Sequence, residues 1–383
     1  MENTEKKKSI KFLQCSDIHL DAPYVGISAE KSEERRRELR KSFSRLMQYV
    51  RDRGVDIVLM CGDIFDMEYA TNTTAEVLIR EFKNCSNAIF VIAPGSTDSY
   101  QNNPIYTSGR LPSNCRVITE PGLTRVDIDE YNVTVYGWAF QGPEMEENPL
   151  YERHVDDISR INFVCGYADL DGSLSSKICP VSETDIKNFG ADYYAFGSRH
   201  ESSDIERVGA SFYSYCGSIE CTGFKDPGIG GANLIIVDEK DGAISMDVRK
   251  LTFGHLKFAT ETVDVTGVNA HNEIINRISG LISEKKYGME TALRVILTGY
   301  VEPRFATPSG FDLEAFGLYY FDLVDKTLPL YGTESFERDM SVKGELFRNL
   351  HPMLLSENEE DRLVAARAFR IGLAALENRE IDG

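Results

Sequence analysis

Several features are missing from this sequence, and each absence excludes a class of protein. No apolar run reaches the roughly 18 residues that a membrane span requires. The apolar segment in the basic start, MENTEKKKSIKFLQC, is short and lacks a small-residue cleavage site, so no secretory leader is predicted. The 8 cysteines show no C-x-x-C spacing, which argues against a disulfide scaffold and against a zinc knuckle. We therefore expect a cytoplasmic protein with mostly buried, reduced thiols.

Net positive charge is also lacking. The chain has 42 lysines and arginines against 61 aspartates and glutamates, a formal net charge of -19. Nucleic-acid affinity depends on basic side chains that neutralise phosphates, so this balance argues against broad adhesion to DNA or RNA. A local basic groove, or a metal that takes over this role, remains compatible with it.

The apolar pattern of the first 95 residues predicts alternating strands and helices. Residues 10–15, 55–61 and 88–93 form apolar runs of strand length, and helical patterns lie between them at 33–53 and 73–84. This alternation is typical of a mostly parallel sheet that helices cover. Ligand sites of such sheets lie beyond the carboxyl ends of their strands.

The rest of the chain predicts a completed first domain and a smaller one. Short alternating strands at 116–140 either extend the first sheet or form a facing one. Further elements are predicted at 161–165 (strand), 182–189 (helix), 193–196, 233–237 and 243–248 (strands). A new α+β pattern then begins, with a strand at 257–265, a helix at 269–283, a strand at 292–298 and helices at 342–354 and 361–376. We expect domains at 1–254 and 255–335, followed by a helical segment at 336–383 that docks on the body or on a partner.

Polar motifs follow three of the predicted strands. Asp17 and His19 come directly after the first strand, and residues i and i+2 of an extended segment point the same way. Asp63 follows the second strand, and His200 follows a later one. Two carboxylates and two imidazoles form a mixed oxygen and nitrogen set that suits zinc, manganese or iron.

In order and spacing, these motifs resemble those of the calcineurin-like phosphoesterases. The runs DIHLDAP (17–23), VDIVLMCGDIFD (55–66), APGSTD (93–98) and DYYAFGSRH (192–200) resemble the family series D-x-H, G-D-x-x-D, G-N-H-D and G-H-x-H. HLDAP and YCGSIE (215–220) are similar to the SbcD-like DNA-repair exonucleases in particular. The resemblance implies an α/β fold: a sandwich of two mixed sheets flanked by helices, with a smaller C-terminal α+β domain.

The resemblance also implies a metal centre. Family members use two metals that clamp a phosphate and activate a hydroxide for in-line attack. The ligands of the first metal are all present, as Asp17, His19, Asp63 and His200.

The positions that serve the second metal are changed. Its own ligands are an Asn, a His after a strand and the first His of G-H-x-H, and we match these to Ser96, Cys165 and Ser198. The family histidine that assists the leaving group is Thr97 here. We therefore expect one divalent transition metal, Mn, Zn or Fe.

Other residues near the changed positions are open to two interpretations. Arg199 either binds a phosphate or is a solvated surface arginine, and Cys165 is either a thiolate near a metal or a buried thiol. Asp98, with Asp169, is a candidate for binding substrate or a cation. Asp66 is expected to be a structural hydrogen-bond acceptor.

Two functions follow from the resemblance. The first is a metal-dependent phosphoesterase, related to nucleases that act on DNA ends with a partner ATPase, in which hydrolysis is weak or altered. The second is a non-catalytic pseudoenzyme that scaffolds an SMC-like ATPase, with the C-terminal helices as the docking segment. The resemblance also allows a homodimer.

Overall fold

The computed structural model describes residues 9–24, 29–170, 176–225, 228–240, 243–301, 316–329 and 336–376. The chain divides into two compact units, Met1–Leu256 and Lys257–Gly383. The division predicted from the sequence, with boundaries after 254 and 335, stays a prediction. The basic start of the sequence and the last seven residues of the predicted helical segment lie outside the described residues.

The first unit contains two six-stranded mixed sheets. In spatial order, the strands of the first sheet are β14 (Ala243–Thr252), β13 (Gly231–Lys240), β1 (Ser9–Cys15), β2 (Ile57–Met60), β3 (Ile89–Ile92) and β4 (Cys115–Val117). Those of the second sheet are β11 (Glu206–Val208), β12 (Ser211–Tyr215), β10 (Tyr193–Gly197), β7 (Ile161–Tyr167), β6 (Val133–Gly137) and β5 (Thr124–Ile128). A small parallel pair is formed by β8 (Asp169–Leu170) and β9 (Pro180–Val181).

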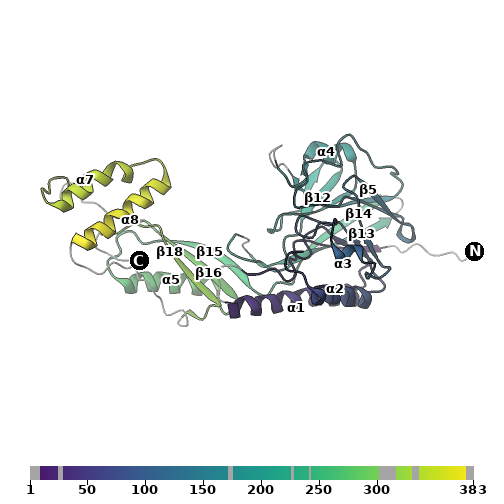
Figure 1. Ribbon diagram of the computed structural model, residues 1–383, viewed down its shortest axis with the longest axis horizontal. Coiled ribbons are helices and arrows are strands. Elements are labelled where there is room, and N and C mark those ends of the chain that lie inside the picture. Colours follow the sequence, from purple (N-terminus) through teal and green to yellow (C-terminus); the bar gives the residue numbers. More distant parts are fainter. Residues whose placement is uncertain are drawn as a thin grey trace, which may run out of the picture. The chain divides into compact units, whose positions relative to one another are not determined.

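Helices cover the outer faces of this sandwich. The long helices α1 (Ala29–Arg53) and α2 (Asn72–Asn84) pack on the first sheet, and they run along the same side of the unit (Figure 1). Helix α4 (Glu183–Phe189) packs on the second sheet. Two single turns complete the unit, α3 (Pro104–Thr107) and a 3-10 turn at Asp129–Tyr131.

Strand β2 shows why the sequence forms a covered sheet. Ile57 and Leu59 face the core between the two sheets, whereas Val58 and Met60 face the helices. Because both faces are buried, the strand reads as one unbroken apolar run. The predicted α/β fold with two mixed sheets is confirmed.

The strands expected at 116–140 divide between the two sheets. Strand β4 continues the first sheet in parallel with β3, and β5 and β6 form an antiparallel edge of the second sheet. Both arrangements that the sequence left open therefore occur. Of the last two strands of the unit, β13 pairs antiparallel with β1, and β14 pairs antiparallel with β13.

The second unit has its own core. Strands β15 (Lys257–Asp264), β16 (Thr291–Thr298) and β18 (Tyr320–Asp325) form a parallel sheet, and helix α5 (His271–Lys285) connects the first two. A short parallel pair is formed by β17 (Tyr300–Val301) and β19 (Leu328–Pro329). Two further helices, α7 (Val342–Leu354) and α8 (Glu359–Leu376), pack side by side (Figure 1).

The last helix buries only part of its apolar face. Ala366, Phe369 and Leu373 are buried, whereas Leu376 is exposed. Among the described residues, no helix combines the length and the apolar composition that a membrane span requires.

Candidate metal centre

The candidate residues gather at one rim of the sandwich, beyond the carboxyl ends of five strands. Asp17 and His19 follow β1, Asp63 follows β2, and His200 follows β10. The segment after β3 and the end of β7 also lie at this rim. Parallel strands bring their carboxyl ends to the same edge, which is why motifs far apart in the sequence meet here.

Three of the predicted ligands form a group that is able to hold a metal ion. The ligand atoms of Asp17, His19 and His200 all lie within 4.8 Å of one another. The Nε2 atoms of the two imidazoles are 3.2 Å apart, and Nε2 of His200 is 3.7 Å from Oδ1 of Asp17. Two nitrogens bound tetrahedrally to one metal at about 2.0–2.1 Å are separated by about 3.3 Å, so the imidazole spacing fits a shared cation.

The Asp17 carboxylate supports the same conclusion. Its Oδ1 atom is buried and has no hydrogen-bond partner among the described residues, while Oδ2 accepts the backbone N–H of Ser198 at 3.2 Å. A buried, unpaired carboxylate oxygen is costly, and a cation at this point would remove the cost. Burial and the nearby Asp63 carboxylate raise the pKa of Asp17.

Asp66 orients His19. Its Oδ1 lies 2.6 Å from Nδ1 of His19, which directs the opposite ring nitrogen toward His200. A carboxylate behind a metal-binding imidazole commonly fixes its tautomer and orientation. Burial alone would lower the pKa of His19, but the hydrogen bond to Asp66 and the surrounding carboxylates outweigh it and raise the pKa to about 9. The structural role expected for Asp66 agrees with this contact.

The backbone at three of these positions is unusual. Asp17, His19 and Asp63 have φ angles of 48°, 49° and 53°, in the left-handed region that residues other than glycine rarely adopt. Backbone hydrogen bonds between the segments that follow β1 and β2 hold this conformation. They run from the N–H of Asp17 to the carbonyl of Gly62 and from the N–H of His19 to the carbonyl of Asp63, both at 3.0 Å. Such strain costs on the order of 1–3 kcal/mol per residue and clusters at functional sites.

Asp63, the fourth predicted ligand, lies close to the group but outside it. Its Oδ2 is 3.9 Å from Nε2 of His19. Both carboxylate oxygens already accept hydrogen bonds: Oδ1 from the N–H of Thr97 at 2.8 Å, and Oδ2 from the hydroxyls of Ser96 at 3.0 Å and Tyr167 at 2.7 Å.

The match of Cys165 to a second-metal ligand is wrong. Its thiol is fully buried in the core between the sheets, 3.6 Å from the sulfur of Cys61. The side chain that reaches the rim from this strand is Tyr167, two residues further along. The prediction ended the strand at 165, whereas the buried strand continues through Gly166 to Tyr167.

The other changed positions are bonded within the protein. Ser198 donates its hydroxyl to the carbonyl of Ala168 at 2.6 Å, and Thr97 donates its hydroxyl to the carbonyl of Phe65 at 3.2 Å. Neutral hydroxyls that donate in this way are poor metal ligands. The residues at the second position do not fit a bound cation.

Asp98 lies beneath the rim. It is completely buried and accepts hydrogen bonds from the N–H groups of Asp63, Ile64 and Gly95 and from the Tyr106 hydroxyl. Burial and the charge of Asp63 raise its pKa to about 7. This geometry favours a structural role, and its predicted contact with substrate stays a prediction.

Arg199 is half-exposed at the same edge. Its guanidinium donates to the carbonyl of Leu170 at 2.6 Å, lies 3.5 Å from Asp169 and stacks 4.6 Å from the centre of the Tyr215 ring. Asp169 is thus paired with an arginine. The contact of Arg199 with a phosphate stays a prediction.

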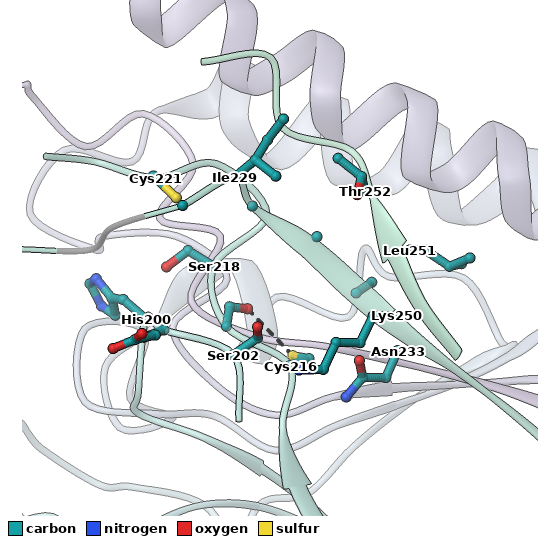
Figure 2. Close-up of a pocket in the computed structure, with 16 residues that line it drawn as sticks. His200, Ser202, Cys216, Ser218, Cys221, Ile229, Asn233, Lys250, Leu251 and Thr252 are labelled. Atoms are coloured by element: carbon teal, nitrogen blue, oxygen red, sulfur yellow. Dashed lines mark hydrogen bonds between the residues drawn. The ribbon is translucent and has the colours of Figure 1, made fainter. Parts of the chain in front are cut away.

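A cavity of about 270 Å³ lies beside the group. His200 stands at one edge of it, and Leu251 lies at the opposite end (Figure 2). Cys216, Cys221 and a glycine-rich run at 228–231 contribute to its walls. Asp17 and His19 are not among the described residues that line it, so the candidate metal position lies outside the cavity.

The fold and the candidate metal-binding group are consistent with the class of metallophosphoesterases. The family model of the calcineurin-like phosphoesterases matches residues 10–201, and the chain belongs to this family. A curated relative is the uncharacterized metallophosphoesterase YhaO of Bacillus subtilis strain 168, 23% identical over 303 residues that span 75% of this chain and 71% of YhaO.

Solved structures also match, with low TM-scores. TT1561 of Thermus thermophilus has a TM-score of 0.37 and 11% identity, and the match covers 62% of this chain and 98% of that one. Vacuolar protein sorting 29 of Cryptosporidium parvum has a TM-score of 0.30 and 16% identity, and the match covers 64% of this chain and 100% of that one.

Proposed function

We propose that this protein binds phosphodiesters at a single divalent cation, with weak or altered hydrolysis, and that it is related to the SbcD-like DNA-repair exonucleases. The observation that carries the proposal is the buried Oδ1 of Asp17, which has no hydrogen-bond partner among the described residues and faces two imidazole nitrogens 3.2 Å apart. Such an arrangement is costly in the absence of a cation and favourable in its presence.

The chain's own residues would divide the work as follows. Asp17, His19 and His200 hold the cation, Asp63 is the fourth ligand, and Asp66 orients the ring of His19. A divalent transition metal bound there supplies a Lewis acid that polarises a phosphoryl oxygen. Manganese, zinc and iron all suit this donor set.

The loss of proton-transfer groups limits the expected rate. Thr97 stands where the resemblance places a leaving-group histidine, and its hydroxyl is engaged by the carbonyl of Phe65. General acid–base help is typically worth about 10²- to 10⁴-fold, so slow hydrolysis is expected.

A non-catalytic scaffold subunit is the second candidate. The observation that favours it is that Ser96, Thr97 and Ser198 all use their hydroxyls in internal hydrogen bonds. The second unit also offers a surface to a partner, for which we propose an SMC-like ATPase. Exposed apolar residues on and beside α7 and α8 include Met340, Val342, Leu355, Val364 and Ile371.

Manganese-dependent hydrolysis of an aryl phosphodiester and of single- and double-stranded DNA tests the proposal. We expect slow turnover that falls at least about tenfold in His200→Ala and is unchanged in His154→Ala, a matched control at an exposed histidine. Turnover that His200→Ala leaves intact would overturn the proposed site. A wild-type protein that binds the cation without turnover would favour the scaffold function over the hydrolase.

Three accompanying properties belong to the same proposal. We place the protein in the cytoplasm and allow for a homodimer. The net charge of -19 favours short or local contact with DNA over extended electrostatic binding. Sedimentation of the purified chain, alone and with DNA at two salt concentrations, measures both association properties.

A further inference from the structure

We propose that Tyr167 replaces the second cation of the family: its hydroxyl, with two neighbouring donors, satisfies Asp63 and restricts the rim to one metal. This inference rests on the proposed single-cation site. Tyr167 is the side chain that closes the second position, and it acts as a positioning residue for Asp63.

The hydrogen bonds of Asp63 are the first argument. An ionised carboxylate offers about four lone-pair positions. Tyr167, Ser96 and the backbone of Thr97 donate to three of them, at 2.7, 3.0 and 2.8 Å. About one position is left for a cation held with Asp17, His19 and His200. A carboxylate that bridges two cations would have to lose at least one of these donors.

The packing of Tyr167 shows that this arrangement is built into the fold. An added Cβ at Gly62 would lie 2.5 Å from the ring, and one at Gly95 would lie 2.9 Å from it. Phe140 packs edge-on against the ring at 5.4 Å, and the indole N–H of Trp138 donates to the Tyr167 carbonyl at 3.0 Å. Two glycines thus make room for the ring, and two aromatic residues fix its position.

The charge of the site gives the physical reason. Asp17 and Asp63 are both buried at the rim. Hydroxyl and N–H donors stabilise a buried carboxylate by hydrogen bonding, as a cation does by its charge, but they bring no further positive charge. With Tyr167 in place, one divalent cation balances the negative charge of the two carboxylates.

Metal counting on variants tests the proposal. The triple variant Tyr167→His, Ser96→Asn and Ser198→His exchanges donors for side chains that bind metals. Equilibrium dialysis against Mn²⁺ followed by elemental analysis gives the metal equivalents per chain, and EPR detects two ions close enough to couple. Tyr167→Phe is the matched control, since it removes the hydroxyl and adds no ligand.

We expect the triple variant to bind one equivalent more than the wild-type protein, with a coupled EPR signal, and Tyr167→Phe to gain none. No gain in a triple variant whose circular dichroism is native overturns the inference, as does a wild-type protein that binds two equivalents. If the triple variant does not fold, Tyr167→His alone decides by the same criterion. A wild-type protein that binds no Mn²⁺ contradicts the proposed function instead. The role of Tyr167 is tested separately, by the difference in bound metal equivalents between the variant and the wild-type protein.

Discussion

At the scale of single residues, the candidate site is a set of residues whose burial and backbone strain cost folding free energy. A bound cation would offset that cost. Asp17 is buried with an unsatisfied oxygen, His19 and His200 face each other, and the backbone at Asp17, His19 and Asp63 is left-handed. Without a bound cation, these features lower the stability of the folded chain. Their coincidence at one rim favours a metal site over chance clustering of polar residues.

Asp66→Asn is expected to weaken Mn²⁺ binding. The variant keeps the size of the side chain and removes the charge that fixes the His19 ring, and loss of such a partner typically costs about 10- to 100-fold in metal affinity. Isothermal titration calorimetry measures the change. Asp204→Asn, at an exposed carboxylate paired with Lys250, is the control and should leave affinity unchanged. Equal affinity of Asp66→Asn and wild type would show that Asp66 does not orient a ligand.

Gly62→Ala is expected to destabilise the first unit more than Gly54→Ala. Both glycines have positive φ angles, 90° and 59°, but an added Cβ meets the Tyr167 ring at 2.5 Å in the first case and nothing within 4 Å in the second. The left-handed backbone alone costs about 1–2 kcal/mol, so the excess at Gly62 measures the clash. Chemical denaturation gives the free energy of unfolding of both variants. An equal decrease in the two would contradict the described packing of Tyr167.

At the scale of elements, the sequence predicted the strands that are buried on both faces and was least accurate at their ends. Strand β2 is an unbroken apolar run, and α7 was predicted at its observed bounds, Val342–Leu354. Strand β7 was predicted two residues short, and this error placed Cys165 instead of Tyr167 at the rim. A glycine before an aromatic residue resembles a strand end, and only the three-dimensional packing shows that the strand continues.

The pairing of α7 and α8 depends on a small aromatic core. Phe369 is completely buried and packs against Phe336 and Phe347 at ring distances of 5.6 and 5.8 Å. Phe369→Ala is expected to destabilise this helix pair by about 3–5 kcal/mol. Ile371→Ala, on the same helix at a side chain that is 41% exposed, should cost under about 1 kcal/mol. Hydrogen exchange of the α7 and α8 amides measures the loss of stability in each variant. Similar protection in the two variants would contradict this packing.

At the scale of the whole molecule, the two units are expected to respond differently to metal. All the residues of the candidate centre belong to Met1–Leu256, and the second unit has its own core. The order of the rim motifs predicted the family and three members of the metal group. The hydrogen bonds that close the second position could not be predicted, because they join residues from three separate segments of the chain.

Removal of metal by a chelator is therefore expected to lower the melting temperature of the first unit only. A ligand at about 100 times its dissociation constant stabilises a folded protein by about 2.7 kcal/mol. Scanning calorimetry with and without Mn²⁺ should show one transition that moves and one that does not. A shift of neither transition at saturating Mn²⁺ would contradict metal binding by the folded chain.

The most direct test of the account is the number of metal ions that one chain holds. Elemental analysis after dialysis against Mn²⁺ should give one equivalent for the wild-type protein and none for His200→Ala. Two equivalents in the wild-type protein, or one that persists in His200→Ala, would contradict a single cation held by Asp17, His19 and His200.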